Sequence, residues 1–294
     1  MDTNNPFQRT QRILAFGAAA LGAMLLLTGC NDGDTIVFVE DNPPAVPTGV
    51  YTITGDGLVV VLWNPVRQED VAGYGVYRSA TLDGEYARIA TMTSREDDEY
   101  TDFDVVNGIT YFYAVDAFDH AGNESELSYE AAFDTPRPEG TGETIFARLE
   151  QPARSGIDFS DWGRSRFVTA WDAPDADVFF QTVGNVLFAK GTVIGNLPND
   201  VQDMGWTASM DDVSWAPEDG WSVAPSGVEM IEEHTYVVWT HDSFFAKFRV
   251  TAILRSQGVP TGLVLDWAYQ VDQSNPELSP GWTMGEKGSG GGAS

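Results

Sequence analysis

Cysteine and histidine are almost absent from this sequence. Its 294 residues include one cysteine, Cys30, and three histidines. A single cysteine excludes an internal disulfide, so the fold must depend on apolar burial. The scarcity also excludes the cysteine and histidine clusters that hold structural zinc. Glycine-rich phosphate loops and a Gly-x-Ser-x-Gly nucleophile turn are missing as well. These absences predict a protein that is not an enzyme.

Basic residues are the second scarcity. Sixteen lysines and arginines stand against 44 aspartates and glutamates, which gives a formal net charge of −28. A surplus this negative repels nucleic acid and anionic lipid head groups and excludes both as partners. The chain is nevertheless 43% hydrophobic and 12% aromatic, which is too apolar for a disordered acidic protein. We therefore expect folded domains whose acidic surface serves solubility.

The longest apolar run lies near the N-terminus. It covers residues 13–27 and follows Arg9 and Arg12. About 15 residues suit a signal-peptide core but fall short of the ~20 that span a bilayer. The run ends in Leu-Thr-Gly-Cys, which resembles the bacterial lipobox. That resemblance implies cleavage before Cys30 and attachment of lipid to its thiol, with residues 1–29 as the signal peptide.

Residues 30–46 then predict a polar, proline-containing tether between the lipid and the first domain. Asn31 follows the cysteine. In the sorting rule of well-studied Gram-negative lipoproteins, an aspartate at this position favours the inner membrane. The resemblance therefore implies an exported protein that is held by its lipid on the outer membrane or cell surface.

Residues 47–136 alternate in polarity over short segments that are separated by turn residues. The segments cover 58–63, 73–78, 86–92 and 110–115, and Asn-Gly and Asp-Gly pairs lie between them. Short strands at this spacing, without a helical pattern, indicate an antiparallel β-sandwich.

Four motifs in this region resemble a bacterial fibronectin type III domain. Trp63 precedes Asn-Pro, Gly-Tyr-Gly-Val-Tyr-Arg begins at residue 73, Tyr-Phe-Tyr-Ala-Val-Asp-Ala at 111 and Ala-Gly-Asn-Glu-Ser at 121. The resemblance implies that Trp63 and Tyr74 lie in the core. It also implies a spacer or docking role, which is common for such modules in bacterial extracellular proteins.

Beyond a predicted linker at 137–142, residues 143–284 predict a second β-rich domain. Residues 285–294 are rich in glycine and serine, which predicts a disordered tail. Region 195–228 shows no clear period. Strands are expected at 145–149, 156–160, 167–171, 176–181, 186–189, 234–240, 244–254 and 263–270. The fold class predicted for the whole chain is all-β, with a lipoprotein signal followed by two antiparallel β domains.

The clearest local feature of the second domain is a predicted hairpin. Residues 234–240 and 244–250 are two segments rich in apolar residues, His-Asp-Ser between them predicts a hairpin turn, and residues 262–270 extend the meander. With the segments at 156–160 and 175–180, this pattern resembles the HmuY-like haem-binding lipoproteins. That resemblance implies a fold and raises haem as a possible ligand.

Two groups of residues are candidate sites for haem or a metal ion. His234 and His241 are the histidines of this domain, but they lie a strand length of ~20 Å apart. Asp172, Asp175 and Asp177 offer oxygen ligands to Ca²⁺, yet they lack the glycine and closing glutamate of an EF-hand. We therefore favour an acidic turn over a calcium site and assign no haem ligand.

Trp206, Trp215 and Trp221 lie in the region without a clear period. They could form an aromatic platform for sugar rings, although tryptophans in such regions more often seal the edge of a domain. The whole sequence predicts a lipid-anchored, surface- or periplasm-facing binding or adhesion module for a protein or glycan. A haem- or metal-scavenging lipoprotein and a structural subunit of an envelope complex are the alternatives.

Overall fold

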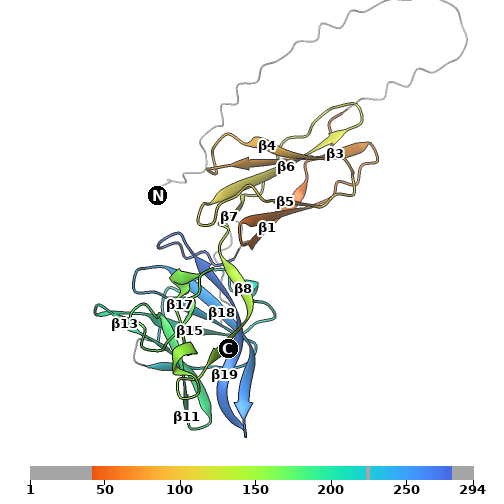
Figure 1. The fold of residues 1–294 in the computed structure, drawn as a ribbon. Helices are drawn as coiled ribbons and strands as arrows, with labels where there is room; N and C mark the ends of the chain where they lie inside the picture. Colours follow the sequence, from red (N-terminus) through yellow and green to blue (C-terminus); the bar gives the residue numbers. More distant parts are fainter. Residues whose placement is uncertain (1–41, 223–225, 280–294) are drawn as a thin grey trace, which may run out of the picture. The chain divides into compact units, whose positions relative to one another are not determined.

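The computed structural model describes residues 42–222 and 226–279. Cys30, the signal peptide, the tether up to residue 41 and the C-terminal tail lie outside the described residues. The remainder confirms the all-β class, with strands labelled in Figure 1. The 3-10 helices are η1 (Pro152–Arg154), η2 (Phe159–Asp161) and η3 (Met210–Asp212). Within the two described ranges, no helix has the length and apolar character needed to cross a membrane.

The first domain contains a three-stranded and a four-stranded antiparallel sheet. Strands at 58–63, 73–78, 86–92 and 110–115 are confirmed, whereas the first, fifth and seventh strands were not predicted. The three-stranded sheet has the order β1 (Thr48–Gly55), β2 (Leu58–Asn64), β5 (Glu99–Asp102), and the other β4 (Ala87–Met92), β3 (Val71–Ser79), β6 (Tyr111–Asp119), β7 (Ala132–Asp134).

Alternation on these strands produces the core of the first domain. Val59, Val61 and Trp63 are buried every second residue along β2. Trp63 packs against Tyr74 of the other sheet, with 5.5 Å between ring centroids. The Tyr74 hydroxyl accepts a hydrogen bond from the Val66 amide and donates one to a backbone carbonyl. The core positions predicted for Trp63 and Tyr74 are thus confirmed.

Two five-stranded antiparallel sheets build the second domain, and a small hairpin joins them. One sheet has the order β10 (Val168–Thr169), β9 (Gly156–Ile157), β11 (Val178–Val183), β12 (Val186–Gly191), β16 (Gly227–Glu229). The second has the order β15 (Asp200–Trp206), β17 (His234–Trp239), β18 (Phe245–Ser256), β19 (Val259–Gln270), β8 (Glu139–Phe146). The hairpin is β13 (Val193–Ile194) with β14 (Leu197–Pro198).

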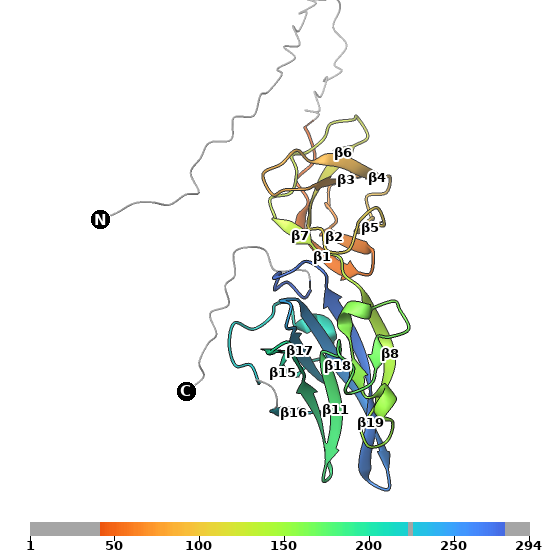
Figure 2. The same cartoon turned by 60° about the vertical axis from the view of Figure 1, so that its left-hand side comes forward.

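The predicted meander is confirmed, because β17 pairs with β18 and β18 with β19 (Figures 1 and 2). Tyr236 and Val238 of β17 face the core, where they join Phe180 of the opposite sheet and Phe248 of β18. The Phe180 and Phe248 rings meet edge to face at 6.0 Å. Intervening residues of β17 point to the outer face of the sheet, which carries the candidate site.

Several elements differ from the sequence expectations: besides β15 and β8, strands β14 and β16 begin within residues 195–228, and η2 occupies Phe159–Asp161, where a strand was expected. Strand β15 lies inside region 195–228, where no strand was expected, because only Val201 on it contributes to the main core. Strand β8 begins at Glu139, within the segment whose composition predicts a linker. Within this strand, position 140 requires glycine because a Cβ there would lie 2.6 Å from Nε1 of Trp267. A glycine at this position therefore signals close packing.

Candidate functional site

Three aromatic rings form a cluster at one end of the β17–β18 hairpin. Trp239 ends β17 and is paired directly with Phe245, which begins β18. Trp221 contacts both rings, at centroid distances of 5.7 Å to Trp239 and 6.4 Å to Phe245. Trp239 is 40% exposed. The hairpin thus fixes an aromatic cluster with a face open to solvent.

The part of this outer sheet face next to the three rings is covered. Val237 is buried in a small second cluster with Val213, Ala216 and Leu278. These residues come from the irregular segment after β15 and from the last described residues of the chain. Trp221 and Phe245 pack against the same cluster. The three rings therefore lie at the margin of a covered face.

Lys247 holds this cover in place. Lys247 lies two residues after Phe245 on β18, and its side chain is 0% exposed. Its Nζ donates to the carbonyls of Met210 (2.9 Å) and Val213 (3.1 Å) and to the Ser279 hydroxyl. Burial, reinforced by the charge of Arg137, lowers the pKa of Lys247. One buried amine thus ties the sheet to both covering segments.

The structure brings only one of the three predicted tryptophans into the aromatic cluster. Trp206 pairs with His234 at the far end of β17 from Trp239, and its indole donates to Glu233 at 3.1 Å. Trp215 forms an isolated bridge with Glu277. The platform that Trp206, Trp215 and Trp221 could have formed is not assembled, because strand register places Trp206 opposite His234 and Trp221 packs on Trp239 and Phe245 instead.

Trp239 and Phe245 were missed as site residues, although a signal was available. Both flank the predicted His-Asp-Ser turn, and residues that flank a hairpin turn become cross-strand neighbours. The turn itself is confirmed: the Ser243 amide donates to the Thr240 carbonyl at 2.9 Å, and Ser243 has a φ of 69°. Two aromatic residues that flank a short hairpin turn therefore predict a cross-strand pair of rings, as for Trp239 and Phe245.

The two candidate haem ligands are kept apart. His234 lies at the start of β17, where its Nδ1 is 3.0 Å from both carboxylate oxygens of Asp203. His241 lies beyond the other end of that strand, and its amide donates to Asn199 Oδ1 at 2.7 Å. A strand of this length separates them by ~20 Å, so they cannot clamp one iron between them.

The three candidate calcium ligands have different surroundings. Asp177 is 4% exposed and accepts a hydrogen bond of 2.9 Å from the Phe159 amide. Asp175 pairs with Arg166, and Asp172 is exposed. Burial raises the pKa of Asp177 to about 8. Across residues 42–222 and 226–279, no group of three or more acidic, histidine or cysteine side chains is placed to hold a metal ion.

No family model matches the chain. A stretch of 87 residues is 37% identical to an amylopullulanase of Thermoanaerobacterium saccharolyticum, and 112 residues are 34% identical to one of Thermoanaerobacter thermohydrosulfuricus. These stretches cover 30% and 37% of this chain but only 6% and 7% of those enzymes. A solved Fn3-like protein of Clostridium thermocellum is 32% identical over 34% of this chain and all of its own, with a TM-score of 0.27.

The first domain is fibronectin type III-like. Domains of this kind are typically non-catalytic, although the curated relatives are enzymes. The chain spans less than a tenth of the length of those relatives, so their activity does not transfer with the match. The HmuY-like resemblance of the second domain stays a prediction.

Proposed function

We propose that this chain is an exported, lipid-anchored binding module without enzymatic activity. Lipid on Cys30 would hold it to a membrane, the fibronectin type III-like domain would act as spacer or dock, and the second domain would contact a protein or glycan at the cell surface. The order of basic residues, apolar run and Leu-Thr-Gly-Cys supports the anchor. Homology of the first domain to part of larger proteins supports a modular role.

The observation that carries the binding role is the cluster of Trp221, Trp239 and Phe245. An indole that only sealed the domain edge would be covered, yet Trp239 is 40% exposed although Val237 of the same strand face is buried. Exposed tryptophans that are held rigidly are enriched at recognition surfaces because little conformational entropy is lost when they bind. The net charge of −28 favours a neutral or basic partner over an acidic one.

The anchor and the surface need separate experiments. Full-length protein expressed in the source bacterium is expected to begin at Cys30 and to carry lipid there, which mass spectrometry of the N-terminal peptide detects, and Cys30→Ser is expected to carry none. An unaltered protein whose Cys30 carries no lipid would overturn the lipid anchor.

For the surface, full-length protein in detergent is titrated onto intact cells and their isolated surface polysaccharide and protein fractions. Trp239→Ala is expected to weaken binding about tenfold, as for a buried interface anchor. Trp206→Ala is the matched control, since Trp206 is exposed but lies at the other end of the strand. Equal binding by the two variants would refute this surface. A haemin Soret band that His234→Ala abolishes would instead support the scavenging alternative.

A further inference from the structure

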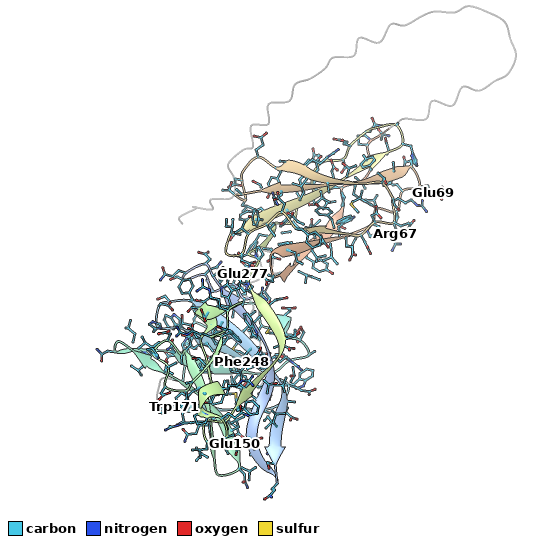
Figure 3. All side chains as sticks on the ribbon, in the orientation of Figure 1. Arg67, Glu69, Glu150, Trp171, Phe248 and Glu277 are labelled. Carbon is cyan, nitrogen blue, oxygen red and sulfur yellow. The ribbon has the colours of Figure 1, made fainter. Side chains whose placement is uncertain are left out.

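A second aromatic feature lies in a different part of the second domain. A cavity of about 380 Å³ is lined by residues that include Trp171, Asp172, Phe179, Thr192 and Val193. Its volume is at the small end of the ~300–1,000 Å³ that ligand pockets occupy. Figure 3 shows Trp171 at the margin of the domain, whereas Phe248 lies within its body. The cavity thus combines two aromatic rings with a carboxylate and a hydroxyl.

The Trp171 ring is fixed before any ligand arrives. Its amide donates to the Pro152 carbonyl at 3.2 Å. The Arg148 guanidinium lies over the indole, 3.5 Å from the ring centroid, and Phe179 meets the ring edge-on at 5.8 Å. Arg148 is itself held by a backbone hydrogen bond of 2.8 Å to Phe180. A ligand that stacks on this ring pays little ordering entropy.

Arg148 also decides which charge the cavity accepts. Arg148 lies over the ring and is not among the residues that line the cavity, and we therefore place it on the indole face turned away from the cavity. A cation on one face draws π-electron density toward itself and leaves the open face less attractive to a second cation. Asp172, which is exposed and lines the cavity, repels anions. Asp172 thus disfavours an anion and the occupied indole disfavours a stacked cation, so a neutral ligand suits a stack on Trp171 best.

The chemistry of the lining then narrows the class of ligand. An open indole face suits a flat array of C–H groups, and the Asp172 carboxylate accepts hydrogen bonds from hydroxyl groups. A sugar ring has both, on different sides. We propose that this cavity binds one sugar residue of a neutral glycan, stacked on Trp171 with hydroxyls directed to Asp172. This assignment rests on the proposed function as a binding module, but it uses a separate site.

The test is a titration of full-length protein in detergent with neutral hexasaccharides of the malto-, cello-, xylo- and manno-series, followed by calorimetry. Tetragalacturonate and tetramethylammonium are the charged comparisons. At least one neutral series is expected to bind, and both charged probes to bind at least about tenfold more weakly. Trp171→Ala should weaken sugar binding about tenfold or more, while Trp239→Ala should leave it within about twofold.

A second variant guards against loss of fold. Val193 is 57% exposed and lines the cavity, so Val193→Arg obstructs it without disturbing the core. It should weaken sugar binding as Trp171→Ala does, with an unchanged circular dichroism spectrum.

The assignment is overturned if no neutral hexasaccharide binds, if a charged probe or an apolar peptide binds better, or if Trp171→Ala and Val193→Arg bind as the unaltered protein does. Sugar binding lost only in Trp239→Ala would leave the binding module intact and refute this cavity. Loss of cell-surface binding in Trp239→Ala together with no sugar binding would retain the proposed function alone.

Discussion

Replacing Lys247 by methionine should loosen the cover of the outer sheet face. Its Nζ donates to two buried carbonyls, Met210 and Val213, at 2.9 and 3.1 Å. Without the amine the Val213 carbonyl has no donor among the described residues, which costs about 1–3 kcal/mol, whereas the Met210 carbonyl keeps a hydrogen bond of 3.3 Å from the Val213 amide. Methionine is nearly as long as lysine and leaves no large cavity. Relief from burying the amine offsets part of this cost, and we expect the free energy of unfolding to fall by about 1–2 kcal/mol.

The assay is urea unfolding followed by tryptophan fluorescence, with hydrogen exchange at the Val213 amide as a local measure. Lys190→Met is the matched control, because Lys190 is a half-exposed lysine of β12. Its effect should stay within about 0.5 kcal/mol. If Lys247→Met is as stable as the unaltered protein, the hydrogen bonds of the amine only offset the free-energy cost of burying it. Lys247 would then not stabilise the packing of the covering segments on the sheet.

Three further outcomes follow from the described contacts. Burial raises the pKa of Asp177 to about 8 and that of Glu277 to about 7, so between about pH 4 and 8 these two carboxyl groups hold more protons in the folded protein than in the unfolded protein. Their contribution to the free energy of unfolding therefore falls as pH rises, whereas the lowered pKa of Lys247 contributes in the opposite sense. The loss of stability from about pH 5.5 to about pH 8, measured by the urea midpoint, should be smaller in Asp177→Asn than in the unaltered protein, and an unchanged slope would exclude Asp177 as a source. Tyr74→Phe removes a hydroxyl that joins two backbone groups and should cost about 1–3 kcal/mol in urea unfolding; no loss would mean that water replaces it. Gly140→Ala places a Cβ 2.6 Å from Trp267 and should lower the free energy of unfolding by about 1–3 kcal/mol, seen as a lower melting temperature. The control is Gly142→Ala, which has open space around its Cβ but a φ of 69° and so measures backbone strain alone. Equal losses of stability in the two variants would refute the packing argument.

The parts of the fold that the sequence predicted are short apolar segments bounded by turn residues. In β17, Tyr236 and Val238 enter the main core and Val237 enters the smaller cluster on the other face, so the hairpin could be found from its apolar run and the turn that follows it. Strand β15 could not be predicted from the sequence, because its pairing with β17 depends on backbone hydrogen bonds and includes a register shift near Trp206, neither of which leaves a pattern of polarity. In β8, the glycines at 140 and 142 predict a linker by composition. Only the position of the Trp267 ring against Gly140 shows that a strand requires glycine there.

The candidate site shows the same division between local and long-range information. Trp206, Trp215 and Trp221 are neighbours in sequence, and proximity along the chain predicted a common platform. Register places Trp206 opposite His234 and leaves Trp221 with rings from a hairpin that starts 13 residues later at His234. Sequence patterns locate aromatic residues on a strand, but only the pairing of strands decides which rings meet.

The covered face and the aromatic cluster are physically connected, and this connection yields a further expectation for Lys247→Met. Trp221 lies in the irregular segment whose Met210 and Val213 carbonyls accept hydrogen bonds from Lys247, and it packs on the same small cluster as Val213. Loosening that segment should therefore displace Trp221 from Trp239 before the main core unfolds. In the variant, quenching of tryptophan emission by acrylamide should rise at urea concentrations where far-ultraviolet circular dichroism is unchanged. Coincident transitions would instead show that the cover and the two sheets unfold as one unit.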